Sequence, residues 1–391
     1  MPRHCLVRPP DRRVPPFPVQ RQDGRSTMTA VQAERQADSS AVEVVGGVDT
    51  HKDTHTAAAV DTAGRVLGSA QFPTDAAGYR ALLRWLRGFG TLLLVGVEGT
   101  GVYGAGLARL LAAQGVAMVE VDRPDRKARR WQGKSDPVDA EAAARAALAR
   151  VRTGLPKQRD GRVEALRALR VARRSAVGQR ADVQRQIKAL IVTAPESLRA
   201  QLRTLPDREL IKVCADQRPD RAGAGDPGTA TKIALRSLAR RHRALSVEIA
   251  DLDELLGPLV AQINPGLLAL KGIGPDVAGQ MLVTAGENAD RLTNEAAFAM
   301  LCGVAPLPAS SGRTTRHRLN RGGDRAANSA LWRIVITRMA TDQRTKNYIA
   351  RRTAQGLTKP EIIRCLKRYV AREVFLALTS ASAEKRPAKA A

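Results

Sequence analysis

Four acidic side chains stand out because of the segments in which they occur. Asp49 ends a β-branched run in Gly-Val-Asp-Thr-His-Lys, and Glu98 ends a second apolar run in Val-Glu-Gly-Thr-Gly. Asp136 and Asp139 lie three residues apart in Lys-Ser-Asp-Pro-Val-Asp-Ala, a spacing that puts both on one face of a helix. Carboxylates from separate elements are the oxygen ligands with which a site that acts on phosphodiesters holds Mg²⁺ or Mn²⁺. The four acids therefore predict a divalent-metal site.

A structural role competes with this interpretation for two of the acids. Asp136 precedes Pro137 and suits the N-cap of a helix, and Asp139 would then lie in the first turn, where the helix dipole favours a negative charge. Taken alone, this pair favours capping. Together with Asp49 on a first strand and Glu98 at the end of another strand, it favours the metal site.

Other potential ligands nearby fit less well. Asp53 and Glu120 are the nearest other acids, and neither falls where the expected fold would direct it inward. His51 and His55 are four residues apart, but they fall on a predicted turn and strand, with no cysteine nearby and no glutamate at the catalytic spacing. The sequence therefore does not predict zinc.

The elements that must position the acids form a recognisable order. Residues 42–48, 54–60 and 66–72 predict three antiparallel strands, with a hairpin turn at 61–64. Apolar spacing then predicts helices over 76–89 and 103–114, buried strands over 91–97 and 116–121, and a helix from near Asp136. The order βββαβαβα is the topology of the ribonuclease-H-like nuclease fold, which would place Asp49 on the central strand and Glu98 at a strand's carboxyl end.

The composition indicates a polyanionic partner. The 391-residue chain has 64 Lys and Arg against 38 Asp and Glu, a formal charge of +26 and a pI of about 11.1, which favours nucleic acid over a membrane surface. GC-rich coding can account for part of the arginine. With 43% hydrophobic residues and no long apolar run, we expect no membrane span. The four scattered cysteines fit a reducing cytoplasm.

The chain begins with a segment that we exclude from the fold. Residues 1–40 are rich in proline and arginine and contain no apolar stretch that could act as a secretory signal. We expect this segment to be disordered. It is either a basic arm or the product of a start codon placed ahead of Met28.

The middle of the chain is predicted to be helical and basic. Residues 151–190 hold eleven Lys or Arg and three acids, so one helix face carries a basic stripe, which we assign to nucleic acid; a solvated surface helix is the alternative. The stripe residues chosen are Arg167, Arg170, Arg173 and Arg174.

Leucines then repeat every seven residues from Leu238 to Leu259, which predicts a coiled-coil seam that Gly257-Pro258 bends or ends. A Gly/Asp/Pro-rich link over 216–228 joins the two helical segments. The resulting arm could pair with itself or with another copy, and a helix packed inside a globular domain is the alternative.

The last third of the sequence combines a possible phosphate-binding turn with an arginine-rich loop. Leu270-Lys-Gly-Ile-Gly-Pro275 matches a helix-hairpin-helix turn, in which Lys271, Gly272 and Gly274 would contact DNA; a plain connection between helices is the alternative. Residues 307–325 read as a loop, and two helices, 326–341 and 359–379, close the domain. The loop's candidate contacts are Arg313, Arg316, Arg318 and Arg321.

These motifs together resemble a known family. Residues 47–52, 97–101 and 134–140, the coiled-coil arm, Gly272-Ile-Gly274, and Cys302-Gly-Val-Ala-Pro306 with Ser311-Gly312 look like the DEDD transposases of insertion-sequence family one-hundred-and-ten, relatives of the Piv-type invertases. The resemblance covers residues 42–379. Ser310 stands where the family has a variable residue, so the serine assignment could move by one position. The N-terminal extension and the long link around 216–228 are not expected of a minimal member.

The resemblance implies a mechanism and a set of partners. It assigns Asp49, Glu98, Asp136 and Asp139 to metal binding in a RuvC-like domain, and Ser311 to a nucleophile that becomes joined to DNA and leaves a free 3′-hydroxyl. It implies donor and target DNA, a noncoding RNA that bridges them, and a homo-oligomer that is a dimer, or a tetramer in the synaptic complex. The acids of one subunit and the serine of another would form a composite site in the bacterial cytoplasm, at the nucleoid.

The predicted organisation follows the motifs. It comprises a disordered basic extension (1–40), a RuvC-like catalytic domain (41–150), a helical coiled-coil arm (151–265), a C-terminal transposase domain (266–380) and a tail (381–391). Two other function classes stay open. One is a RuvC-like nuclease or junction resolvase that uses water instead of serine, and the other is a DNA-binding protein without catalysis whose acids are helix caps.

Overall fold

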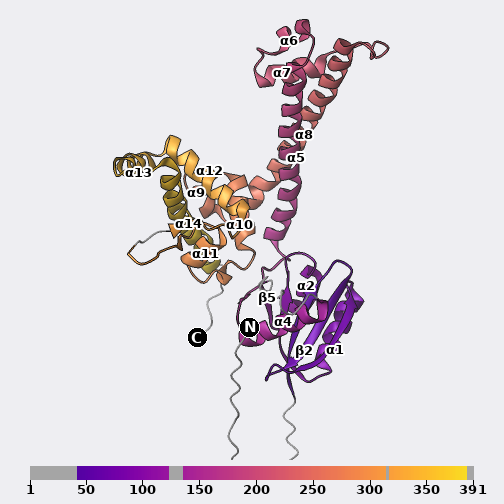
Figure 1. Cartoon of the computed structure of the whole chain (residues 1–391), viewed down its shortest axis with the longest axis vertical. Helices are drawn as coiled ribbons and strands as arrows, with labels where there is room; N and C mark the ends of the chain where they lie inside the picture. The colour runs from indigo at the N-terminus through magenta and orange to yellow at the C-terminus, as the bar shows by residue number, and fades with distance from the viewer. Residues whose placement is uncertain (1–41, 123–134, 314–316, 385–391) are drawn as a thin grey trace, which may run out of the picture. The chain divides into compact units, whose positions relative to one another are not determined.

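The computed structural model describes residues 42–122, 135–313 and 317–384 (Figure 1). The expected extension over 1–40, the tail from 385 onwards and Arg316 lie outside the described residues. The described part consists of a mixed α/β region, a pair of long helices, and a helical C-terminal region. No helix in these ranges combines the length and the apolar character needed to cross a membrane.

A six-stranded sheet forms the first region. Its strands are β1 (Glu43–Thr50), β2 (Thr54–Asp61), β3 (Val66–Pro73), β4 (Thr91–Glu98), β5 (Met118–Val121) and β6 (Thr153–Gly154). They lie in the order β3-β2-β1-β4-β5-β6, with β1 parallel to β4, β4 parallel to β5, and the other neighbours antiparallel. The expected order of strands is confirmed, and so is the central place of β1. The short β6 was not predicted, since two residues carry no periodic signal.

Helices cover both faces of this sheet. On one face α1 (Ala76–Arg87) and α2 (Ala105–Ala113) bury Leu82, Leu86, Leu107 and Leu111 against valines of β1 and β4. On the other face α4 (Asp136–Ala149) packs small residues against Val45 and Val60. Burial on both faces explains why β1 is almost wholly apolar instead of alternating between apolar and polar residues.

Two long helices follow. The helix α5 (Arg162–Val192) packs along α8 (Pro227–Ile263), and two short helices, α6 (Glu196–Leu202) and α7 (Asp207–Asp216), close one end of the pair (Figure 1). A connection without helix joins Asp216 at the end of α7 to Pro227 at the start of α8, within the range expected for the link, whereas α6 and α7 were not predicted. Gly257-Pro258, expected to bend or end the helix, does not end it, because α8 continues through Pro258 to Ile263.

The predicted seam of α8 is covered within the chain. Leu245 and Ile249 pack with residues of α5 and α7 in one apolar cluster, and Leu256 joins the cluster of the C-terminal region. For Leu245 and Ile249 the arm therefore packs on itself, which is one of the two pairings expected, whereas Leu256 packs inside the helical C-terminal core, as the alternative expected. Pairing of this seam with another copy stays a prediction.

The C-terminal region is helical around one core. It contains α9 (Pro265–Ala269), α10 (Pro275–Ala285), a 3₁₀ turn η2 (Ala289–Arg291), α11 (Glu295–Leu301), α12 (Arg325–Thr341), α13 (Gln343–Ala354) and α14 (Lys359–Glu384). The two expected closing helices correspond to α12 and α14, and α13 between them was not predicted. The ends of α5 and α8 contribute Leu166 and Val260 to the same core, so the helical pair is anchored in this region.

Candidate active site

Two parallel strands bring the first two acids to one edge of the sheet. Asp49 is the next-to-last residue of β1, and Glu98 is the last residue of β4. Val48 pairs with Val97 in the register, so Asp49 and Glu98 follow side by side on neighbouring strands. Thr50 Oγ1 donates a hydrogen bond of 2.7 Å to the Glu98 carbonyl and ties the two strand ends together.

The pleat of both strands directs these acids toward α4. Val48 and Val97 pack on the side of α1 and α2. Because side chains alternate along a strand, Asp49 and Glu98 lie on the opposite face, which α4 covers. Asp136 and Asp139 lie in the first turn of that helix, so all four predicted acids belong to one edge and one face of the sheet.

Small residues allow α4 to approach so closely. A Cβ added to Gly47 would lie 2.2 Å from both the Ala140 carbonyl oxygen and the Ala144 nitrogen, so the helix backbone packs directly against β1. At Gly96 on β4 the corresponding distance to the Ala143 carbonyl oxygen is 2.7 Å. Glycine in the strands and alanine on the helix therefore determine where the first turn of α4 places its acids.

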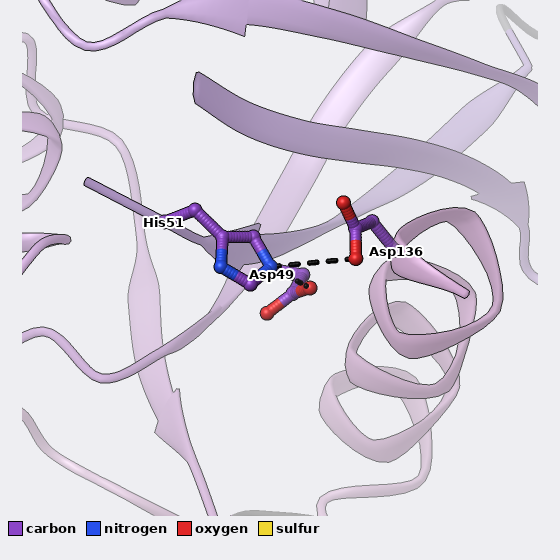
Figure 2. A group of neighbouring side chains, drawn as sticks. All are labelled: Asp49, His51 and Asp136. Atoms are coloured by element: carbon purple, nitrogen blue, oxygen red, sulfur yellow. Dashed lines mark hydrogen bonds and ion pairs between the residues drawn. The ribbon is translucent and has the colours of Figure 1, made fainter. Parts of the chain in front are cut away.

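Three side chains meet at the centre of this edge (Figure 2). His51 Nε2 lies 3.1 Å from Asp49 Oδ2 and 3.4 Å from Asp136 Oδ1. One potential ligand atom from each residue lies within 4.8 Å of the others, a spacing that could hold a metal ion. The Asp49 side chain is only 9% exposed, whereas those of Asp136 and His51 are 38% and 44% exposed, so the group is open to solvent at Asp136 and His51.

The electrostatics of this edge favour a bound cation. Burial raises the pKa of Asp49, the neighbouring Asp139 and Asp136 raise it further, and His51 partly offsets both effects. Removing charge from water is costly, and like charges add to that cost. A divalent cation would relieve both, which fits the donor set of carboxylate oxygens.

Capping does not account for Asp136. The N-cap of α4 is Ser135, and Asp136 is the first helical residue, with Pro137 next to it in the first turn. The N-cap role, which was the alternative for Asp136, is therefore wrong, although Asp136 and Asp139 both lie in the first turn, where the helix dipole favours acids. Asp139 is buried, and its backbone N–H bonds the Ser135 carbonyl at 3.0 Å.

The structure adds His51 to the predicted acids. Sequence reasoning considered His51 only as a zinc partner of His55, which instead is fully buried and stacks on Tyr79 with ring centroids 5.5 Å apart. The sequence feature that could have identified His51 is its spacing from Asp49. The two residues are two positions apart at a strand end, and in extended chain this spacing puts both side chains on one face of the sheet.

The predicted nucleophile lies on an exposed hairpin of the helical region. Residues 307–325 are not simply a loop, because β7 (Leu307–Pro308) pairs with β8 (His317–Arg318). Ser311 is exposed at this hairpin, and Gly312 has a φ of +56°, which glycine adopts without strain. Arg313, Arg318 and Arg321 are exposed as well.

Several predicted nucleic-acid contacts already have partners in the chain. Arg167 pairs with Glu164, Arg170 with Asp276, and Arg173 with Asp253 and Asp276. Arg174 is exposed and has no ion pair within the described ranges. The first three therefore hold α5 together or fix it to its neighbours, and their contact with nucleic acid stays a prediction.

The predicted helix-hairpin-helix turn is packed against α12. Lys271 Nζ lies 3.3 Å from Asp342 Oδ1, and the Lys271 carbonyl accepts a 2.7 Å hydrogen bond from Arg338 Nε. Gly272 has a φ of +79°, and Gly274 is the N-cap of α10. A connection between helices explains these contacts, and DNA contact by the turn stays a prediction.

Two models of one protein family match this chain, one in the sheet region and one in the helical C-terminal region. A family model described as a transposase of the DEDD type of IS110 matches residues 46–194, and a second, "Transposase IS116/IS110/IS902 family", matches residues 265–350. The first match contains all four acids. The chain belongs to the IS110 family of DEDD transposases.

A relative from Streptomyces coelicolor supports the same family. It is described as "Insertion element IS110 uncharacterized 43.6 kDa protein" and is 30% identical over 146 residues. The match spans 36% of this chain and 36% of that protein, so the chain matches about a third of the relative's length.

Proposed function

We propose that this protein is a transposase that cleaves and exchanges DNA strands for an insertion sequence. The observation that carries the proposal is the convergence of Asp49 and Asp136, with Glu98 and Asp139 on the same face, in a chain of the IS110 family. The sheet order and the place of the acids support the assignment of this region to a ribonuclease-H-like, RuvC-like catalytic domain.

The four acids would hold Mg²⁺ or Mn²⁺. A bound divalent metal neutralises charge on a phosphate and lowers the pKa of an attacking hydroxyl. Asp49 and Glu98, on strands that Thr50 ties together, provide a fixed side of the site. Asp136, more exposed than Asp49 on the first turn of α4, provides the side that faces the substrate.

Ser311 would be the nucleophile. Its Oγ would attack the scissile phosphorus and form a phosphoserine ester, the bond from phosphorus to the 3′ oxygen would break, and the 3′ oxygen would take up a proton. The serine proton would pass to a base of the site. Its exposure, the positive φ of Gly312 and the exposed Arg313 and Arg318 suit a hydroxyl that must come close to a phosphate.

The serine region and the acids would come from different subunits. The described residues give Ser311 and the carboxylates to different regions of the chain. The α5–α8 pair, read as a coiled-coil arm, and the helix-hairpin-helix turn would then serve assembly and DNA contact. A charge of +26 fits donor and target DNA together with a bridging noncoding RNA.

The proposal is tested by trapping the covalent intermediate. A plasmid carrying the gene with its flanking DNA supplies substrate and any RNA, and the protein is recovered under denaturing conditions with Mg²⁺ present. We expect an adduct that Ser311→Ala removes and Ser310→Ala retains. A phosphonucleotide on Ser310 would move the assignment by one residue.

The runner-up function is a metal-dependent RuvC-like nuclease or junction resolvase. It predicts 5′-phosphate ends, no adduct on any serine, and full cleavage by Ser311→Ala. Loss of cleavage in Asp49→Asn would leave that alternative standing, so the serine variants decide between the two mechanisms.

A further inference from the structure

A large cleft lies in the helical C-terminal region, among α12, α13, α14 and the turn before α10. Its volume is about 1230 Å³, and residues such as Lys271, Arg344, Tyr348, Arg351 and Tyr369 line it. Pockets for small ligands hold roughly 300 to 1,000 Å³, so this cleft offers room for more than one small chemical group.

The cleft carries an aromatic platform that is open to solvent. Tyr369 on α14 is 52% exposed, an unusual exposure for a large ring. Its ring and that of Tyr348 make a T-shaped contact, with a centroid distance of 5.7 Å and an interplanar angle of 81°. The Arg351 guanidinium lies 5.4 Å from the Tyr348 centroid. Tyr348 is therefore held on two sides and fixes the ring of Tyr369.

The acids that line the cleft already form ion pairs within the chain. Asp342 pairs with Lys271 at 3.3 Å, and Glu373 pairs with Arg338 at 2.7 Å. A further cation, Arg372, pairs with Glu295.

The positive charges of two arginines in the cleft are not neutralised by a carboxylate of the described residues. Arg344 and Arg351 are exposed and have no carboxylate partner among the residues that the structure describes. The cleft therefore keeps an excess of positive charge beside an exposed ring.

We propose that this cleft binds an unpaired stretch of single-stranded nucleic acid, with a base stacked on Tyr369 and phosphates at Arg344 and Arg351. Single-strand sites elsewhere combine a basic groove with an aromatic ring on which a base stacks. A duplex cannot supply that base, since its base faces are covered by neighbouring pairs. An acidic peptide would match the charge but would leave the ring without a partner. The inference rests on the proposed function, because it assumes a nucleic-acid partner.

The test is fluorescence anisotropy of the full chain with labelled 12-nucleotide strands of thymidine or uridine and with a duplex, without divalent metal. We expect Tyr369→Ala to weaken single-strand binding at least about fivefold, whereas Tyr369→Phe keeps the ring and binds within about twofold of the parent. Arg344→Ala and Arg351→Ala should each lower the slope of log affinity against log salt by about 0.7. Arg84→Ala removes an exposed arginine of α1 and is the matched control. In that background, Tyr369→Ala should weaken single-strand binding as much as it does in the parent.

Several outcomes would overturn the inference. The first is that the parent protein does not bind single strands. The second is that Tyr369→Ala, with an unchanged melting temperature, binds single strands as tightly as the parent, or loses as much affinity for the duplex as for the single strand. The third is that polyglutamate displaces the strand from the parent but not from Arg344→Ala. Tighter binding of uridine or of thymidine strands would support it and assign the cleft to RNA or DNA.

Binding is measured without cleavage, so the two proposals can fail separately. If no adduct and no strand exchange are found, but Tyr369→Ala still weakens single-strand binding, the proposed function fails and the proposal for the cleft stands.

Discussion

The carboxylate edge of the sheet and the serine hairpin differ in how firmly the fold holds them. Asp49, Glu98 and Asp139 are buried, and they project from strands and a helix whose backbones pack almost in contact. Ser311 is exposed on a hairpin whose two strands have two residues each. The first arrangement is fixed before any substrate binds, whereas the second offers a hydroxyl that needs a partner surface to position it.

This difference teaches where specificity would enter the proposed reaction. A metal site must hold several ligands within a few tenths of an ångström, so it belongs on rigid elements. A nucleophile that is used only after DNA and another subunit assemble can stay on a hairpin. The predictions below therefore contrast changes in the rigid edge with changes elsewhere.

The largest effect is expected from Asp49→Asn. Losing a buried ligand should reduce strand cleavage roughly a thousandfold, since the metal contributes several kcal/mol to the transition state. The same change should not destabilise the metal-free protein. Burial raises the pKa of Asp49 in the folded state above its ordinary value of 3.8, so its ionised form costs stability once the pH exceeds that value.

Thermal unfolding at two pH values checks the second half of this prediction. At pH 7 without metal, Asp49→Asn should melt at or above the temperature of the parent, and the difference should disappear below the ordinary carboxyl pKa of 3.8. A variant that melts well below the parent at pH 7 would make Asp49 a structural residue.

The second prediction compares two glycines. Gly47→Ala places a Cβ 2.2 Å from backbone atoms of α4, so strand and helix must separate, at a cost of about 3 kcal/mol or more. Among the described residues, a Cβ at Gly312 would meet nothing within 4 Å, so Gly312→Ala should cost only the strain of its φ of +56°, about 1 kcal/mol. Chemical denaturation should rank the two variants in this order. The reverse order would mean that the hairpin, not the sheet edge, is the more tightly fixed region.

The third prediction concerns a lysine just after the sheet. Burial, with help from the charge of Arg291, lowers the pKa of Lys157 to about 8, and its Nζ donates to the Val283 carbonyl at 3.2 Å. Between pH 8 and the ordinary value of 10.5 the unfolded chain holds a proton that the folded chain has lost. Stability should therefore rise with pH in that window, by up to about 3 kcal/mol.

Lys157→Met is the matched control for this window. The variant lacks the titrating group, so its free energy of unfolding should increase less than that of the parent between pH 8 and 10. Parallel curves for the two proteins would show that Lys157 keeps its proton in the fold.

The sequence predicted the sheet far better than the rest. Uninterrupted apolar runs such as 91–97 are strong signals, and the glycine turn after Asp61 fixes the hairpin that follows. Asp49 and Glu98 could be found because they end such runs, and Asp136 and Asp139 because their spacing puts them on one helix face. The helices α6 and α7 were missed because they are short and pack on long neighbours. The helix α13 was missed because its mostly polar sequence carries no clear apolar period.

Other parts of the site depend on contacts that spacing does not encode. Pro258 was expected to bend or end a helix, but the helix continues because its apolar face is buried on both sides of the proline, at Leu256 and Val260. The ion pairs of Arg170 and Arg173 join residues about a hundred positions apart, so their arginines read as a free basic stripe in the sequence. His51 was set aside because only its spacing to another histidine was considered.

The smallest effect is expected from His51→Ala. His51 Nε2 bridges Asp49 and Asp136, but its side chain is 44% exposed and could move aside when a cation binds. Mg²⁺ prefers oxygen ligands, so the loss of the imidazole should weaken metal binding less than about tenfold, whereas Asp136→Asn should weaken it more. Titration calorimetry with Mn²⁺ measures both variants without any DNA substrate. If His51→Ala loses more affinity than Asp136→Asn, the imidazole is a ligand, and the rigid edge of the sheet then includes a residue from the turn after β1.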